Sequence, residues 1–241
     1  MLRMKAIILA GGLGTRLRHL LPDLPKPMAP VAGRPFLEYV IERLVDADLR
    51  EIVLSVGYRA DAIRDHFGLR WGGAMISYAQ EREPLGTGGA IAHAVKEEPA
   101  ETVLVLNGDT FLDVNFTELL QWHARECRAA PLAMVLRRVE EVDRYGAVRI
   151  DAGIVTGFDE KGQTGPGLIN AGLYVLNTDL FKRFGLDGRF SLETDLLRAR
   201  LSELRPKAYA TDAFFIDIGV EQDFLRAQLE VPMQFNRDLP E

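Results

Sequence analysis

The chain has 241 residues, of which 47% are hydrophobic and 27% are charged, and its formal net charge is −6. This composition is typical of a globular enzyme with a large buried core, and the negative charge excludes general nucleic-acid binding while leaving room for a small basic pocket for a phosphorylated ligand. No apolar run approaches the ~20 residues of a membrane span, and no secretory signal is found. The single cysteine, Cys127, excludes an internal disulfide framework. We therefore expect a cytoplasmic protein.

Strands and helices alternate in the first half of the chain. Short apolar runs, each long enough for one buried strand, occupy residues 6–10, 51–57, 74–80 and 102–109. Apolar residues at helical spacing occupy residues 36–49, 60–68, 87–98 and 115–127. This alternation predicts an α/β fold with a doubly wound, mostly parallel, Rossmann-like mixed sheet. The carboxyl ends of its strands should meet at one edge, where ligands of such sheets bind.

The second half of the chain has a different pattern. Strand-like pieces joined by short turns occupy residues 132–140, 147–151, 153–158 and 168–176. We expect them to form added, partly antiparallel strands of a substrate-facing subdomain. A helix over 191–201 capped by Ser191, a strand over 213–219 and a closing helix over 220–230 should follow, with a loosely held tail over 231–241.

A glycine-rich loop follows the first predicted strand. Gly11, Gly12 and Gly14 allow backbone N–H groups to approach an anion closely, and the guanidinium of Arg16 can bind phosphate oxygens with two hydrogen bonds. The spacing matches neither the dinucleotide-binding pattern nor the P-loop. A purely structural turn remains an alternative for the glycines alone.

Lys26 lies later in the same loop, between Pro25 and Pro27. The two prolines restrict the backbone and limit where the ammonium group can go, although an exposed lysine is more often a solvated surface charge. Together with Arg16, Lys26 supplies two cations on one loop, which suits a polyphosphate.

Two aspartates follow predicted strands, Asp109 after residues 102–107 and Asp217 after another apolar run. Each alone is equally compatible with a turn or a helix cap. If both lie at the same sheet edge, the paired carboxylates facing a phosphate site indicate Mg²⁺, which also takes waters and phosphate oxygens. The histidines are scattered and show no zinc spacing.

A second glycine-rich turn, EREPLGTGGA over residues 81–90, separates a strand from a helix. It could simply start the helix with Thr87 as the cap, or it could bring bare backbone close to a base or ribose. Glu81 could accept the two donors on the Watson–Crick edge of guanine, which weakly favours that base. Asn170 and Glu193 are polar residues in or beside apolar elements, and the hydroxyls of a sugar would serve as partners for them.

The motifs LAGGLGTRL with PKPMAPV, EPLGTGGA, NGD, INAGLYVL and DIG occur in one order over about residues 4–230. In that order they resemble the sugar-1-phosphate nucleotidylyltransferases. PKPMAPVAGRPFLEYV and LSVGY look most like the D-glycero-α-D-manno-heptose 1-phosphate guanylyltransferases of that family. The resemblance implies a single nucleotidyltransferase domain over 1–241, with a nucleotide-binding half of about 1–130, a sugar-phosphate-binding half of about 131–230 with added antiparallel strands, and a tail.

The resemblance also implies a role for each matched residue. Catalysis would depend on Arg16, Lys26, Asp109 and Asp217, with Mg²⁺ held by the two aspartates. The nucleoside triphosphate would contact Leu9, Ala10, Gly11, Gly12, Gly14, Thr15, Glu81, Gly86, Thr87 and Gly108. The sugar phosphate would contact Gly146, Glu160, Lys161, Asn170 and Glu193, with Lys161 on the phosphate itself.

The activity that follows is transfer of GMP from GTP to D-glycero-α-D-manno-heptose 1-phosphate, giving GDP-heptose and pyrophosphate for bacterial surface polysaccharides. Mannose-1-phosphate guanylyl transfer, and uridylyl or thymidylyl transfer to another sugar 1-phosphate, are the alternatives. A non-catalytic nucleotide-sugar-binding subunit is disfavoured by the retained charged groups, and a nicotinamide dehydrogenase by the glycine spacing. We expect small-molecule substrates, neither nucleic acid nor a membrane as a partner, and a possible homodimer. The short C-terminus argues against an added β-helix or acetyltransferase domain.

Overall fold

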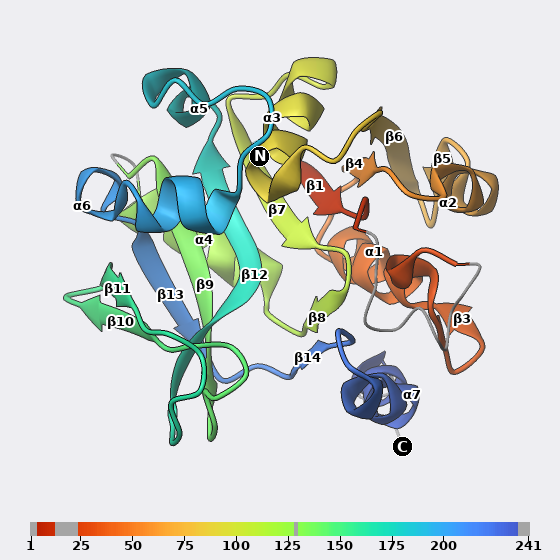
Figure 1. Cartoon of the computed structure of the whole chain (residues 1–241). Helices are drawn as coiled ribbons and strands as arrows, with labels where there is room; N and C mark the ends of the chain where they lie inside the picture. The colour runs from red at the N-terminus through yellow and green to blue at the C-terminus, as the bar shows by residue number, and fades with distance from the viewer. Residues whose placement is uncertain (1–3, 13–23, 128–129, 236–241) are drawn as a thin grey trace.

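The computed structural model describes residues 4–12, 24–127 and 130–235. A ten-stranded sheet extends across these residues (Figure 1). In spatial order its strands are β10 (Val148–Asp151), β11 (Ile154–Phe158), β13 (Lys207–Thr211), β9 (Leu132–Val139), β12 (Gly167–Asn177), β7 (Thr102–Asn107), β1 (Lys5–Leu9), β4 (Glu51–Val56), β6 (Ala74–Gln80) and β5 (Arg70–Trp71). Two short ribbons pair β2 (Pro30–Val31) with β3 (Arg34–Pro35) and β8 (Thr110–Leu112) with β14 (Phe215–Asp217).

The helices lie on both faces of the sheet. They are α1 (Phe36–Asp46), α2 (Ala60–Phe67), α3 (Gly86–Glu97), α4 (Phe116–Glu126), α5 (Asp179–Arg183), α6 (Leu201–Leu204) and α7 (Glu221–Phe235), with a 3₁₀ helix η2 (Lys26–Met28) and a π-helix η3 (Leu192–Arg198). The predicted cap of α4 is confirmed, because the Glu118 N–H donates to Asn115 Oδ1 at 3.2 Å. No described helix has the length and apolar character needed to cross a bilayer.

The first half of the chain forms the parallel part of the sheet. β1 pairs in parallel with β4 on one side and with β7 on the other, and β6 pairs in parallel with β4. The chain therefore adds β4 and β6 on one side of β1 and then adds β7 on the other side. This reversal places the topological switch point between β1 and β7, where open α/β sheets bind their ligands.

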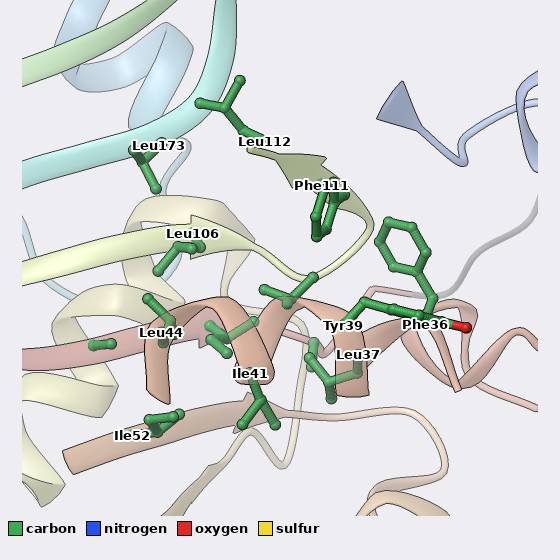
Figure 2. Close-up of a cluster of buried hydrophobic side chains, with 14 of the residues drawn as sticks. Phe36, Leu37, Tyr39, Ile41, Leu44, Ile52, Leu106, Phe111, Leu112 and Leu173 are labelled. Carbon is green, nitrogen blue, oxygen red and sulfur yellow. The ribbon is translucent and has the colours of Figure 1, made fainter. Parts of the chain in front are cut away.

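Alternation along the parallel strands produces two separate cores. Ile8, Ile52 and Leu106 point to one face of the sheet and pack with α1. Figure 2 shows the apolar side chains of α1 filling the space between this helix and strands β4, β7 and β12. Ile7 and Val53 point to the other face and pack with α3. Because successive side chains of a strand point to opposite faces, a strand that is apolar at every position is buried on both. The predicted doubly wound fold is confirmed.

The second half of the chain extends the same sheet. β12 runs antiparallel between β7 and β9, and β10 and β11 form an antiparallel hairpin at the far edge, as the predicted added strands require. β13 was not predicted, and it pairs in parallel with β9. Its sequence, KAYAT, is short and only half-buried, so it carries little of the apolar pattern that identifies a strand.

The closing helix is longer than predicted. α7 continues to Phe235, so the expected loose tail over 231–241 is wrong for residues 231–235. Val231 is fully buried, and the Phe235 ring lies 5.4 Å from that of Tyr39 and 5.8 Å from that of Phe111. Side chains four residues apart pack against the core and stabilise the helix beyond Pro232. On sequence grounds this proline should have ended the helix.

Replacing Val231 by alanine is expected to lower the free energy of unfolding by about 2 kcal/mol, because a fully buried side chain loses two carbons and leaves a cavity. Met233, on the same helix, is 59% exposed. Met233→Ala is therefore the matched control, with an expected change within about 0.5 kcal/mol. Urea unfolding of both variants measures the difference. Equally small changes would show that this segment does not pack as described.

Candidate functional site

The carboxyl ends of β1 and β7 meet at the switch point. The Gly108 N–H donates to the Leu9 carbonyl at 2.9 Å, and the Ala10 N–H donates to the Ser55 carbonyl at 2.8 Å. A Cβ on Gly108 would lie 2.7 Å from the Leu9 carbonyl oxygen, so a larger residue would push the two strand ends apart. This contact brings together the first predicted glycine loop and the turn that carries Asp109.

A cleft of about 420 Å³ opens beside this contact. Six of the predicted nucleotide-binding residues line it: Leu9, Gly11, Gly12, Glu81, Gly86 and Thr87. Three further predicted residues, Gly14, Thr15 and Arg16, lie outside the described residues. Both glycine-rich turns of the sequence therefore contribute to one cleft, although they are about 70 residues apart in the chain.

Glu81 is held in a defined position within the cleft. Its Oε2 accepts the Leu85 N–H at 2.8 Å, and its Oε1 lies 3.4 Å from the hydroxyl of Ser55, which is fully buried. A Cβ on Gly11 would approach Oε1 to 2.9 Å, so glycine at that position makes room for the carboxylate. The result is a preoriented acceptor whose carboxylate has spare lone pairs for a ligand.

The second glycine turn starts a helix, but Thr87 is not the cap of that helix. α3 begins at Gly86, with Leu85 before it, so Thr87 lies inside the helix and is not its cap. Gly86 has a φ of +72°, and a Cβ there would lie 2.6 Å from the Phe190 carbonyl oxygen. Glycine is therefore required at this position by packing against the segment before η3, in addition to any approach of a ligand.

Lys26, Asp109 and Asp217 form a compact cluster. The Lys26 ammonium lies 2.6 Å from Asp109 Oδ2 and 3.5 Å from Asp217 Oδ1, and only 12% of the lysine side chain is exposed. Lys26 begins η2, Asp109 lies in the turn between β7 and β8, and Asp217 ends β14. In the β8–β14 ribbon, Asp217 pairs with Thr110, and this register brings the two aspartates side by side.

The sequence correctly predicts that the two aspartates meet, but by a different route. The expected strand over 213–219 is only three residues long, and it pairs with β8 outside the main sheet. Lys26 was expected on the substrate phosphates, whereas here its ammonium lies between the two carboxylates. The alternative interpretation, a solvated surface charge, does not hold, because the Lys26 ammonium is largely shielded from solvent and has two anionic partners.

The surroundings of Asp217 disfavour the charged form of its carboxyl group. Burial and the charge of Asp109 raise the pKa of the Asp217 carboxyl, and they outweigh the opposing effects of Lys26 and of the Gly219 N–H, which donates to Asp217 Oδ1 at 2.7 Å. A site that holds two carboxylates close together against this repulsion is suited to a divalent cation. No larger group of potential metal ligands occurs in the described part of the chain. Two hard oxygen donors fit Mg²⁺, which commonly binds one or two carboxylates together with phosphate oxygens and waters.

The predicted sugar-site residues Asn170 and Glu193 both lie next to the hydroxyl of Tyr174. Thr87 Oγ1 donates to Glu193 Oε2 at 2.7 Å, and Ser191 Oγ donates to the same oxygen at 3.1 Å. Asn170 Nδ2 donates to the hydroxyl of Tyr174 at 2.6 Å. Tyr174 was not among the site residues predicted from the sequence. Its even spacing from Asn170 along a strand, which places the two on one face, was the available signal.

Glu193 does not lie on the predicted α-helix over 191–201. Ser191 is the N-cap as predicted, since its hydroxyl accepts the Thr194 N–H at 3.2 Å, but the following turns are π-helical. The wider turn changes the direction of the side chains relative to an α-helix. Isolated π-helical turns are rare and occur often at functional sites.

The remaining predicted sugar-site residues form a second group. Gly146, with a φ of +78°, packs against the backbone of 159–161, where a Cβ would lie 2.6 Å from the Asp159 carbonyl oxygen. Lys161 is exposed, and Glu160 Oε1 lies 3.3 Å from Nη1 of Arg198. Arg198 ends η3, the helix that carries Glu193 near its start, so this π-helix connects the two groups.

Comparison with known proteins places this geometry in context. The sequence model of the nucleotidyl transferase family matches residues 5–234 of this chain. The D-glycero-alpha-D-manno-heptose 1-phosphate guanylyltransferase of Aneurinibacillus thermoaerophilus is 40% identical over 228 residues, which cover 95% of this chain and 98% of the relative. The enzyme of the same name from Campylobacter jejuni is 42% identical over 222 residues, covering 92% and 97%.

A solved structure is also similar. The crystal structure of HddC from Yersinia pseudotuberculosis, complexed with GMP-PN, superposes with a TM-score of 0.79 at 36% sequence identity. The match covers 93% of this chain and 98% of that one. The fold is therefore shared with a protein whose structure has been solved in complex with GMP-PN.

Proposed function

This chain belongs to the nucleotidyl transferase family, and on that premise we propose that it transfers GMP from GTP to D-glycero-α-D-manno-heptose 1-phosphate, releasing pyrophosphate. The observation that carries the proposal is the position of the Lys26–Asp109–Asp217 cluster. It lies at the carboxyl ends of β1 and β7, next to a cleft that contains the oriented carboxylate of Glu81. We place the product in bacterial surface-polysaccharide synthesis and the enzyme in the cytoplasm.

The reaction needs no nucleophile from the protein. An oxygen of the sugar 1-phosphate attacks the α-phosphorus of GTP, and the bond from that phosphorus to the bridging oxygen of pyrophosphate breaks. The incoming phosphate is already an anion, so no general base is required. The enzyme must hold two mutually repelling anions in line, and such positioning can supply about 7–11 kcal/mol of the barrier.

The charged cluster addresses the repulsion between the substrates. The carboxylates of Asp109 and Asp217 would hold Mg²⁺, which when bound neutralises phosphate charge. The Lys26 ammonium, which contacts both carboxylates, would bind phosphate oxygens. Lys161, which is exposed, would face the phosphate of the sugar. Arg16, in the glycine loop, completes the proposed set of cations.

Glu81 supports guanine as the base. Its carboxylate is anchored by the Leu85 N–H and keeps acceptor capacity toward the cleft. Guanine presents two donors, N1–H and N2–H, on one edge, so a single carboxylate can accept both. Uracil and thymine present one donor there, and the unmatched carboxylate oxygen would favour GTP over UTP and dTTP.

Pyrophosphate release from four nucleoside triphosphates, each combined with heptose, mannose and glucose 1-phosphates, tests the proposal. We expect the highest kcat/KM for GTP with the heptose phosphate, and no release when either substrate or Mg²⁺ is omitted. The highest rate with mannose 1-phosphate would overturn the choice of sugar, and the highest rate with UTP or dTTP the choice of base. Nucleotide binding without release in any combination would instead support a non-catalytic subunit.

A further inference from the structure

We propose that Tyr174 is a positioning residue, whose hydroxyl orients Asn170 and Glu193 toward the sugar phosphate, and that the Thr87–Glu193 hydrogen bond couples this side of the site to the nucleotide cleft. The inference rests on the proposed function, because it names how the two substrate sites of that reaction communicate. It does not require Tyr174 to touch a substrate.

The hydroxyl of Tyr174 is placed for this role by β12. The residue has no exposed surface, and it is the largest of the fully buried side chains among the described residues. Its oxygen accepts a hydrogen bond of 2.6 Å from Asn170 Nδ2, while the Asn170 Oδ1 accepts the Gly172 N–H at 3.1 Å. The Asn170 amide is thus held from both ends, so its orientation follows from the position of the tyrosine.

The same hydroxyl adjoins the Glu193 carboxylate. Burial is the main cause that raises the pKa of the Tyr174 phenol, and the negative charge of Glu193 with its hydrogen bonding to the phenol raises it further. The phenol is therefore neutral at physiological pH and keeps its proton to donate. Glu193 also receives the hydroxyls of Thr87 and Ser191, so hydroxyl donors surround it on the protein side.

Thr87 connects Glu193 to the nucleotide cleft through its hydroxyl group, which accepts one hydrogen bond and donates another. Its oxygen accepts the Leu192 N–H at 2.9 Å, which leaves its proton to be donated to Glu193. Thr87 also lines the cleft, one residue after Gly86. A shift of the start of α3 on nucleotide binding would therefore move Glu193, and through it the Tyr174 phenol.

Two backbone irregularities coincide with the two residues that Tyr174 holds. The pairing of β12 with β9 shifts register between Asn170 and Leu173, and Glu193 lies in the π-helix η3. Bulges and π-helical turns each interrupt regular hydrogen bonding and are enriched beside active sites, where they redirect side chains. A half-buried carboxylate and a buried phenol are also a costly way to fill a core, so a purely structural role would be served better by apolar residues.

Tyr174→Phe tests the proposal by removing one oxygen and keeping the ring. We expect KM for the sugar 1-phosphate to rise by about tenfold or more, the effect of losing a hydrogen bond to a charged group, while KM for GTP stays within about twofold. Tyr39→Phe is the matched control, because Tyr39 is 2% exposed and donates its hydroxyl to the Val31 carbonyl at 3.1 Å, away from the cleft. It should lose comparable thermal stability without any change in either KM.

Thr87→Val tests the coupling independently of Tyr174. Calorimetry with mannose 1-phosphate, in the presence and absence of a non-hydrolysable GTP analogue, measures how strongly the nucleotide changes sugar-phosphate affinity. We expect a clear change in the unmodified protein, its loss in Thr87→Val, and no further loss in the Thr87→Val/Tyr174→Phe double variant. Separate, multiplying effects of the two changes would overturn the single network.

Two other outcomes overturn the positioning role. One is a Tyr174→Phe protein with the kinetics of Tyr39→Phe, and the other is a protein in which GTP and sugar-phosphate binding fall equally with the melting temperature. If no pyrophosphate is released by the unmodified protein, the proposed function fails. The calorimetric comparison still tests the network in that case, because it depends on binding alone.

Discussion

Asp217→Asn is expected to lower turnover by about 10²–10³-fold, the usual effect of removing one well-placed charged group from a site where charge is stabilised. The substitution keeps the shape of the side chain and its acceptor for the Gly219 N–H, so the loss is one of charge toward the cation and the phosphates. Initial rates of pyrophosphate release at saturating GTP and Mg²⁺ measure the effect. Near-normal turnover would refute the assignment of Asp217 to the metal.

The same variant should be no less stable than the unmodified protein when nucleotide and Mg²⁺ are absent. Burial and Asp109 disfavour the Asp217 carboxylate more than Lys26 and the Gly219 N–H favour it, so an uncharged side chain removes a net cost. Asp187→Asn is the matched control, because Asp187 also pairs with a lysine, Lys96 at 2.6 Å, but is 77% exposed. It should leave both turnover and melting temperature unchanged.

Lys26→Ala is expected to lower kcat by about 10²-fold or more, since one cation of the transition-state site is lost. Unlike Asp217→Asn, it should also destabilise the protein in the absence of Mg²⁺, because Asp109 and Asp217 then face each other without their shared ammonium. Addition of Mg²⁺ should restore part of that stability. A loss of stability in Lys26→Ala that does not occur in Asp217→Asn is the result expected of this cluster.

Lys96→Ala is the control for Lys26→Ala. Its ion pair is as short, at 2.6 Å, but its side chain is 62% exposed, so solvent screens the interaction and its removal should change neither kcat nor stability measurably. Steady-state kinetics with each substrate varied in turn separates the possible roles of Lys26. A change confined to KM for the sugar phosphate would contradict a role on the triphosphate.

Local patterns allowed most of the fold to be predicted. The apolar runs of β1, β4 and β7 are read from consecutive residues, because burial on both faces leaves few polar positions within them. Helical spacing, the Asn115 and Ser191 caps and the stop at Gly68 are likewise local signals. Prediction failed where packing overrides local preference, as in α7 beyond Pro232, and where an element is too short to show a period, as in β13. The strand that contains β14 was predicted, but its length and its pairing with β8 were not.

The candidate site also has a part that the sequence predicts and a part that it does not. The residue types that can bind phosphate, a cation or a base were evident from the sequence, because glycine, lysine and aspartate carry their chemistry wherever they lie. Which of them act together was decided only by the tertiary structure. Lys26 meets Asp109 from 83 residues away, and Thr87 meets Glu193 from 106 residues away. Such contacts depend on strand register and on the path of the chain between elements, which no local pattern encodes. Tyr174 illustrates this most clearly, since a tyrosine in an apolar strand is read as core until the fold places Asn170 and Glu193 beside its hydroxyl.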